Sequence, residues 1–294
     1  MSRDAAKAIA RLRADRVRAV VSAALLETAD AFEDLPAPQV LLRGDAWTGV
    51  TTTIDADGWR AVLITAGGRR TASRTCTLID PDGVAAASFA ADPAATRALA
   101  AAAACLAPRL VRTDQPVRLG VLGAGPLGRT AVAELTAALD VERVAIHDVD
   151  PAVAGAAADL GTVVADAATA VRDATLIVTA TNARDPVLRA DWVAEGATVL
   201  ALGADRRGRR ELDYRLVADA SFVAADSVPV ARALADDLRD CVVEGHLDWQ
   251  EVTPAAEVLA GRVDARVRDE DLVVAKLIDA TPLVLALARA ALGA

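Results

Sequence analysis

Hydrophobic and polar positions follow three different patterns in succession along the chain. In residues 4–32, apolar side chains such as Ile9 and Val17 recur at helical spacing, which predicts one long N-terminal helix. Residues 37–90 hold short β-branched runs separated by glycine and aspartate, which predict an antiparallel sheet. From residue 117 onward, short apolar runs alternate with helical segments. This last pattern is typical of a parallel sheet covered by helices on both faces.

A helix and two prolines mark the change from the second pattern to the third. Asp92 and Pro93 begin an alanine-rich segment that we expect to be helical to about Leu106. Pro108 and Pro116 flank the link that follows. The predicted fold class is therefore α/β, with a Rossmann-type doubly wound parallel sheet joined to a mixed α+β domain.

The stretch V-R-L-G-V-L-G-A-G-P-L-G-R-T, residues 117–130, runs a strand through a glycine turn into a helix. Its G-x-G-x-x-G spacing predicts a dinucleotide site, with Gly123 in the tight turn and Gly125 next to the pyrophosphate. Helix N–H groups face the phosphates at such a turn. Asp148 follows Gly128 by twenty residues and ends the next strand, where a carboxylate accepts the ribose hydroxyls of NAD. The expected cofactor contacts in the turn are Gly123, Ala124, Gly125, Pro126, Leu127 and Gly128.

Two further segments, T-A-T-N and L-G-A-D, each end a predicted strand at the same edge of the sheet. Ligands of parallel sheets bind at the carboxyl ends of the strands, so we expect Thr181 and Gly203 to contact the cofactor as well. Asp148 and Asp150 both flank the expected ribose 2′ position. Because two carboxylates repel a 2′-phosphate, the sequence predicts NAD(H) as the cofactor.

Composition narrows the class of protein further. The 294 residues suggest about two domains, and no apolar run approaches the length of a membrane span. A net charge of −9 argues against nucleic acid as a partner. The N-terminus is charged and lacks the apolar core of a signal peptide, so we expect a cytoplasmic protein. With two histidines and three widely separated cysteines, the chain predicts no metal site and no Ser-His-Asp triad.

The order of motifs resembles the ornithine cyclodeaminase/μ-crystallin family. Besides the glycine turn, the resemblance includes T-A-T-N-A-R-D-P-V-L at 179–188 and the A-D-S of residues 225–227. It continues with E-V-L-A-G-R-V-D-A-R at 257–266. The most specific part is G-A-D-x-x-G-x-x-E-L-D, which lies within 192–213. The resemblance is good from about residue 95 to residue 266.

The resemblance implies three parts with different roles. Residues 1–114 would form the substrate and dimerisation domain, and residues 115–266 the NAD-binding domain. Residues 267–294 would be a C-terminal segment that returns to the first domain. The implied chemistry is hydride transfer at a carbon that bears nitrogen, in a homodimer that acts on a small amine, imine or amino acid.

The resemblance also implies roles for two charged residues. Asp205 matches the family's acid/base aspartate and ends a predicted strand beside the expected nicotinamide, where a carboxylate can shuttle a proton. Arg97 matches the family arginine that holds the substrate carboxylate, a group that guanidinium binds bidentately. The family lysine expected near residues 60–62 is absent, since the chain's lysines are Lys7 and Lys276. Arg60 is the candidate to replace that lysine as a charged substrate contact.

These departures concentrate in the expected substrate site, so we expect a substrate other than free ornithine. Three functions remain open at this point. The first is an NAD-dependent imine reductase or amino-acid dehydrogenase, with Asp205 as the proton shuttle. The second is a cyclodeaminase, an ammonia-lyase that recycles its NAD internally. The third is a non-catalytic NAD(H)-binding protein like the crystallin members of the family.

Overall fold

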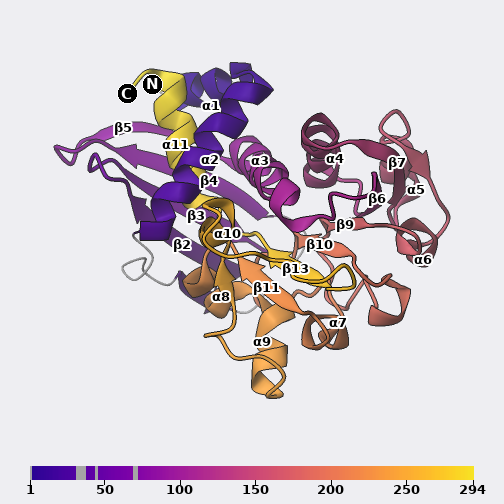
Figure 1. The fold of residues 1–294 in the computed structure, drawn as a ribbon. Coiled ribbons are helices and arrows are strands. Elements are labelled where there is room, and N and C mark those ends of the chain that lie inside the picture. Colours follow the sequence, from indigo (N-terminus) through magenta and orange to yellow (C-terminus); the bar gives the residue numbers. More distant parts are fainter. Residues whose placement is uncertain (1, 31–37, 44–45, 69–71) are drawn as a thin grey trace. The chain divides into compact units, whose positions relative to one another are not determined.

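The computed structural model describes residues 2–30, 38–43, 46–68 and 72–294 (Figure 1). The chain divides into two compact units, Met1–Leu99 with Asp279–Ala294 and Ala100–Ile278. The final helix therefore belongs to the first unit, although the whole second unit precedes it in the sequence. None of the helices within the described ranges is both long enough and apolar enough to cross a membrane.

The first unit contains a five-stranded antiparallel sheet in the order β1-β2-β3-β4-β5, which confirms the sheet predicted for residues 37–90. Alternation decides which side chains are buried: Ala61 and Leu63 of β3 face the core together with Cys76 and Leu78 of β4. The strands are β1 (Gln39–Arg43), β2 (Ala46–Ile54), β3 (Arg60–Gly67), β4 (Ala72–Ile79) and β5 (Ala85–Ala90).

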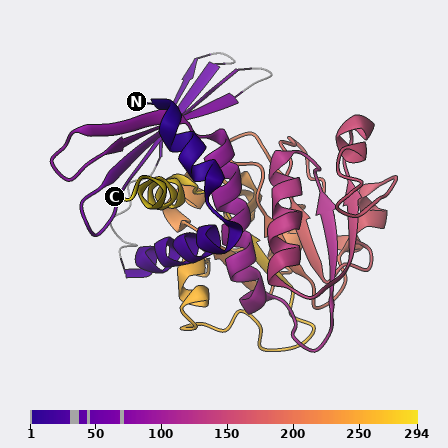
Figure 2. The same cartoon turned by 90° about the horizontal axis from the view of Figure 1, so that it is seen from above.

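Helices from both ends of the chain pack together in the first unit. Helix α11 contacts β2, β3, α1 and α2, and in Figure 2 the indigo and yellow helices lie together beside the purple strands. Their apolar sides are buried, for example at Ile9, Val21 and Leu287. The three helices are α1 (Ser2–Arg11), α2 (Ala14–Asp30) and α11 (Thr281–Leu292).

The prediction of a single N-terminal helix over residues 4–32 is wrong. The helix breaks after Arg11 and restarts at Ala14. The N–H of Leu12 donates a hydrogen bond to the carbonyl of Ile9. The Arg97 guanidinium donates to the carbonyls of Ile9 and Leu12. A distant side chain thus satisfies the carbonyl groups at the end of α1. No glycine or proline stands at the break, so the local sequence carries no signal for it.

The second unit contains an eight-stranded sheet in which every pairing is parallel. Its order is β12-β11-β13-β10-β9-β6-β7-β8. The predicted Rossmann-type fold class is therefore confirmed. The strands are β6 (Val117–Leu122), β7 (Val141–His147), β8 (Thr162–Val163), β9 (Leu176–Thr179), β10 (Thr198–Ala201), β11 (Phe222–Ala225), β12 (Thr253–Pro254) and β13 (Val273–Lys276).

The order of strands reverses beside β6. The chain moves from β6 to β7 and β8 in one direction and then returns to β9 on the other side of β6. Such a switch point opens a crevice at the carboxyl ends of the two central strands, where ligands of doubly wound sheets bind. The residues that follow β6 and β9 therefore lie where a ligand of this fold is expected to bind.

Two sequence-based boundaries fall inside the second unit. Strand β13 pairs with β10 and β11 in the middle of the parallel sheet, so residues 267–278 do not return to the first unit. The V-V-A run of β13 is buried on both faces. An apolar run of this kind is compatible with a strand in either unit, so the sequence alone could not assign it to the parallel sheet. Helix α3 (Asp92–Leu110) continues through Pro108. The boundary between the units falls inside this helix, after Leu99 and not at residue 114, and the second half of α3 joins the core of the second unit.

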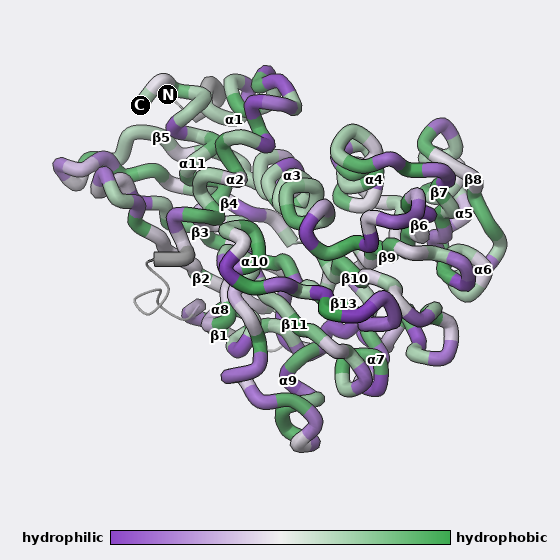
Figure 3. The backbone as a smooth tube through the Cα atoms, viewed as in Figure 1, coloured by the Kyte–Doolittle hydropathy of each residue, from purple (hydrophilic) through white to green (hydrophobic). Residues whose placement is uncertain are grey.

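Short helices cover the second sheet around an apolar core that includes Leu119, Val121, Ile146, Leu176 and Leu200. Strands β10, β11 and β13 carry mostly hydrophobic residues (Figure 3). The helices are α4 (Pro126–Ala138), α5 (Pro151–Gly155), α6 (Ala167–Val171), the 3₁₀ turn Ala190–Trp192, α7 (Tyr214–Ala218), α8 (Val228–Leu234), α9 (Asp236–Val243) and α10 (Ala255–Leu259).

Candidate functional site

The glycine turn directly follows β6 at the switch point. Gly123 has a φ of +100°, a left-handed conformation that favours glycine. A Cβ there would also lie 2.6 Å from the carbonyl oxygen of Ala180, so the turn packs against the segment after β9. Gly125 is the N-cap of α4, and Pro126 occupies the first turn, where its missing N–H costs nothing.

The other two glycines of the motif differ in what surrounds them. A Cβ on Gly128 would lie 1.9 Å from the carbonyl oxygen of Gly123, so this glycine lets α4 pack against the turn. A Cβ on Gly125 would meet no atom within 4 Å. No side chain caps α4, and helix N-termini bind phosphates through their free N–H groups. The turn therefore fits a pyrophosphate, with Leu127 and Gly128 supplying N–H groups after Pro126.

Asp148 follows β7 and is tied to the glycine turn. Its Oδ2 accepts a hydrogen bond from the N–H of Ala124 at 2.8 Å, and its Oδ1 accepts one from the N–H of Asp150 at 2.9 Å. Asp150 is turned toward its own helix, where it accepts the N–H groups of Ala152 and Val153 as the N-cap of α5. The half-buried Asp148 is thus the carboxylate held beside the turn.

The segments after β9 and β10 lie next to each other. Gly203 packs so closely that a Cβ would come within 2.1 Å of the carbonyl oxygen of Thr181, and the N–H of Ala204 donates to that oxygen at 3.0 Å. Since β9 also neighbours β6, the structure places the glycine turn, Thr181 and Gly203 at one edge of the sheet.

Asp205 follows this close approach by two residues. Ala204, directly before it, has a φ of +48°, which non-glycine residues seldom adopt. The Asp205 side chain is 20% exposed, and its Oδ1 lies 3.4 Å from Nη1 of Arg206, whose side chain is 17% exposed. A largely buried carboxylate at the end of a central strand is suited to proton transfer with a ligand in the crevice.

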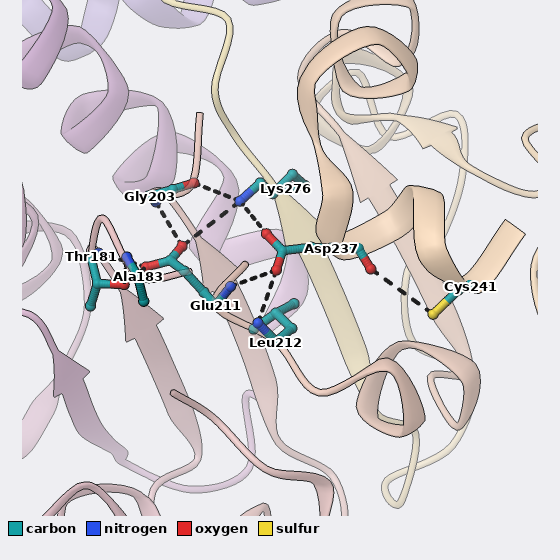
Figure 4. Close-up of polar contacts among 8 residues, drawn as sticks. All are labelled: Thr181, Ala183, Gly203, Glu211, Leu212, Asp237, Cys241 and Lys276. Carbon is teal, nitrogen blue, oxygen red and sulfur yellow. Dashed lines mark hydrogen bonds and ion pairs between the residues drawn. The ribbon is translucent and has the colours of Figure 1, made fainter. Parts of the chain in front are cut away.

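A buried ionic cluster underlies this edge (Figure 4). Lys276 Nζ donates to the carbonyl oxygen of Gly203 at 2.6 Å and to Oδ2 of Asp237 at 2.7 Å, and it lies 3.8 Å from Oε2 of Glu211. Glu211 accepts the N–H and hydroxyl of Thr181 through Oε1, at 2.5 and 2.9 Å, and the N–H of Gly203 through Oε2, at 2.9 Å. The side chains of Lys276, Glu211 and Asp237 are inaccessible to solvent.

The charges of this cluster shift one another's proton affinities. Burial raises the pKa of Glu211, and the nearby Lys276 ammonium opposes that rise. Burial by itself lowers the pKa of Lys276, but the carboxylates of Asp237 and Glu211 outweigh it, so the pKa of Lys276 lies above its usual value. Lys276 is therefore an ammonium group throughout the physiological range.

Sequence reasoning named none of these three residues as functional. Glu211 did lie within the G-A-D-x-x-G-x-x-E-L-D pattern, and Lys276 is one of two lysines in the chain. A lysine at the end of an otherwise apolar strand was the available signal, because a buried lysine needs acidic partners. Asp237 is remote in sequence and carried no comparable signal.

Arg97 and Arg60 belong to the first unit, and both have main-chain partners there. Arg97 Nη1 donates to the carbonyl of Ile9 at 2.6 Å, and its Nη2 donates to that of Leu12. Arg60 Nη1 donates to the carbonyl of Asp80 at 3.1 Å. These bonds give each arginine a structural role, and their predicted contacts with substrate stay predictions.

The described residues contain no group of three histidine, cysteine or acidic side chains arranged to hold a metal ion. Cys76 and Cys241 are buried free thiols. Burial raises the pKa of Cys76 to about 12 and, with nearby acidic residues, that of Cys241 to about 11. Both are thus unreactive as nucleophiles at neutral pH.

The fold defines a Rossmann-type α/β protein with a second, antiparallel unit. Residues 64–278 match the family model described as ornithine cyclodeaminase/mu-crystallin family. The chain belongs to that family, as its motifs indicated.

Known relatives agree with this assignment. A putative dehydrogenase from Rhizobium meliloti is 33% identical over 205 residues, which cover 65% of this chain and 61% of the relative. The chain thus spans less than two thirds of the length of the curated relatives it matches.

Two solved structures share the fold. The Δ1-pyrroline-2-carboxylate reductase of Thermococcus litoralis, in complex with NADH and L-proline, has a TM-score of 0.86 at 21% identity and covers 97% of this chain and 94% of its own. An archaeal alanine dehydrogenase dimer with bound NAD has a TM-score of 0.85 at 21% identity, with coverage of 97% and 92%.

Proposed function

We propose that this protein is an NAD-dependent oxidoreductase that acts on a carbon–nitrogen bond, as an imine reductase or an amino-acid dehydrogenase. The observation that carries the proposal is the position of Asp205. This acid follows β10 at the edge of the sheet where the glycine turn follows β6 and Thr181 follows β9. Family membership and the named activities of the two similar structures support the same chemistry.

The residues at this edge fit NAD(H). The open position at Gly125 and the uncapped start of α4 suit the pyrophosphate, and Asp148 is held where it can accept ribose hydroxyls. Thr181 and Gly203 line the nicotinamide side in this proposal. When bound, the cofactor supplies or accepts the hydride.

Asp205 moves the proton in this proposal. In reduction its carboxyl group donates a proton to the substrate nitrogen, and in oxidation its carboxylate accepts one. The neighbouring Arg206 and the low exposure of Asp205 limit the access of water to the carboxylate. Two nitrogens of Arg97 already donate to the carbonyl oxygens of Ile9 and Leu12. A substrate carboxylate would therefore be bound by the remaining N–H groups of the guanidinium.

A cyclodeaminase is the second candidate, because the chain retains Asp205 and the family motif around it. The family lysine expected near residues 60–62 is absent, and the charged residue available there, Arg60, bonds the main chain of Asp80. The same absence is the observation that favours the third candidate, a binding protein without turnover.

The two enzymatic candidates differ in their net use of NADH. Absorbance at the NADH band would be followed with Δ1-pyrroline-2-carboxylate, with 2-oxo acids plus amines, and with diamino acids, while released ammonia is measured in parallel. The proposal predicts NADH consumption with an imine and loss of that consumption in Asp205→Asn. Ammonia release from a diamino acid without net NADH change would instead identify a cyclodeaminase.

We extend the proposal to a homodimer in the cytoplasm. The dimeric state of the archaeal alanine dehydrogenase of the same fold supports the homodimer, and the cytoplasmic location stays a prediction from the sequence. Light scattering during size-exclusion chromatography tests the assembly: the mass of two chains is expected, and a mass of one chain at micromolar concentration would contradict it.

A further inference from the structure

We propose that Lys276, Glu211 and Asp237 form an ionic lock that positions Asp205 for proton transfer by fixing both ends of its loop. Residues 203–212 are called the Asp205 loop below. The inference rests on the proposed function of Asp205 and adds three positioning residues to it.

Both ends of the Asp205 loop are held by the cluster. At its start, the N–H of Gly203 donates to Glu211 Oε2 at 2.9 Å, and the carbonyl of Gly203 accepts Lys276 Nζ at 2.6 Å. At its end, the N–H groups of Glu211 and Leu212 donate to Asp237 Oδ1 at 2.7 and 2.9 Å. Glu211 thereby closes the loop on itself (Figure 4). Asp205 lies between Gly203 and Glu211 in the sequence and so belongs to this closed segment.

The conformation directly before Asp205 needs such a constraint. Ala204 has a positive φ, and a conformation of this kind costs free energy and persists only where the surrounding structure imposes it. Gly203, which precedes it, has no room for a Cβ against Thr181. The cluster bonds both the N–H and the carbonyl of Gly203, so it fixes the backbone from which the Asp205 side chain projects.

The lock also connects the Asp205 loop to the segment after β9. Glu211 Oε1 accepts both the N–H and the hydroxyl of Thr181, which lies on the expected cofactor side. One carboxylate therefore joins the residues proposed to contact the cofactor and the loop that carries the proton shuttle. A fixed relation between the two is what hydride and proton transfer at adjacent atoms require.

Stability alone does not account for three buried ionisable groups. The rest of β13 is apolar, and a buried ion pair is often no more stabilising than well-packed apolar residues of similar volume. What apolar side chains cannot do is bond the N–H and carbonyl of Gly203 and the N–H groups of Glu211 and Leu212. The raised pKa of Lys276 keeps its ammonium available for this purpose.

The test compares variants that separate positioning from folding. Lys276→Met leaves Asp237 buried without its cation and is expected to fold poorly. The double variant Lys276→Met/Asp237→Asn removes this pair of charges, while the Asn amide oxygen still accepts the N–H groups of Glu211 and Leu212. Without Lys276, burial raises the pKa of Glu211 unopposed, so Glu211 can take up a proton and need not stay charged. Arg210→Gln is the matched control, because it breaks an ion pair with Asp240 that is partly exposed and adjacent to Glu211.

Four quantities are measured for each protein. They are hydrogen–deuterium exchange at residues 203–206, NADH affinity, melting temperature and turnover of Δ1-pyrroline-2-carboxylate. In the double variant we expect recovery of most of the melting temperature and an NADH dissociation constant within about threefold of the parent. Exchange at 203–206 should be at least tenfold faster, and kcat should fall roughly 10- to 100-fold with a smaller change in KM. Arg210→Gln should resemble the parent in all four measurements.

Unchanged exchange at residues 203–206 in the double variant would overturn the lock, and this readout needs no substrate. Recovery of kcat in parallel with the melting temperature would also overturn it, because the cluster would then be structural only. If Asp205→Asn loses turnover while the double variant keeps it, the lock alone fails. If Asp205→Asn keeps turnover, the proposed function itself fails.

Discussion

The carboxylate of Asp148 accepts the main-chain N–H of Ala124 at 2.8 Å, which joins the end of β7 to the middle of the glycine turn. The same carboxylate accepts the N–H of Asp150 through its other oxygen. Its orientation is therefore set before any ligand binds. This carboxylate and the turn together define one end of the proposed cofactor site.

Cofactor selectivity is expected to depend on Asp148. The parent protein should bind NADH at least tenfold more tightly than NADPH, because a held carboxylate accepts ribose hydroxyls and repels a 2′-phosphate. Asp148→Ser should weaken NADH binding about tenfold and reduce the discrimination between the two cofactors. Fluorescence titration of both cofactors measures this.

The control for Asp148→Ser is Glu142→Gln, a change to an exposed acidic residue on the same strand. It alters the net charge equally without touching the turn. Tighter binding of NADPH than of NADH by the parent protein would contradict the assignment of Asp148.

Two glycines of one motif are expected to respond differently to the same substitution. Gly128→Ala places a Cβ 1.9 Å from the carbonyl oxygen of Gly123, so it should destabilise the protein by about 2 kcal/mol or more. Gly125→Ala meets no protein atom within 4 Å and should leave the melting temperature unchanged. It should nevertheless weaken NADH binding at least tenfold, because its methyl group lies where the pyrophosphate approaches.

Thermal melting and NADH titration on both glycine variants check this pair, and each variant serves as the control for the other. An unaltered NADH affinity in Gly125→Ala would contradict the placement of the pyrophosphate beside Gly125.

Arg97 is expected to contribute to the stability of the first unit. Arg97→Met leaves the carbonyls of Ile9 and Leu12 without their charged donor, at a cost of about 1–3 kcal/mol. Urea unfolding measures the loss, and Lys7→Met, on the exposed side of α1, is the control. The KM for a carboxylate substrate is then compared between Arg97→Met and a variant of equal stability. A larger rise in KM in Arg97→Met would establish the additional contact of Arg97 with substrate.

Acid stability is expected to depend on Asp271. Hydrogen bonds from the N–H groups of Arg268 and Val267 lower the pKa of Asp271 from its ordinary 3.8 to about 2. Because the folded state binds the proton more weakly than the unfolded state, Asp271 contributes stability above about pH 4. This contribution is lost as the pH falls through about 2.

Asp271→Asn should therefore melt at a lower temperature than the parent at pH 7, and the difference should shrink toward pH 2. Melting followed by circular dichroism from pH 7 to pH 2 measures it. A difference in melting temperature that stays constant over this range would contradict the role of the charge.

Sequence patterns were most informative where local chemistry determines structure. The glycine spacing and the following acid predicted a turn whose backbone requires Gly123 and Gly128, and the apolar runs predicted a parallel sheet. Long-range contacts escaped prediction. The break after α1 depends on Arg97, and the position of β13 depends on pairing with strands far earlier in the chain. The buried partners of Lys276 likewise come together only through the fold.

Hydride transfer and the role of Asp205 are tested together by transfer of deuterium from [4,4-²H₂]NADH to an imine, followed by mass spectrometry of the amine product, with the parent protein and Asp205→Asn. We expect labelled product from the parent, at least a 100-fold lower rate in Asp205→Asn, and NADH affinities of the two proteins within about threefold of each other. Equal rates of labelling in the two proteins would contradict the role of Asp205 in proton transfer, and with it the proposed function.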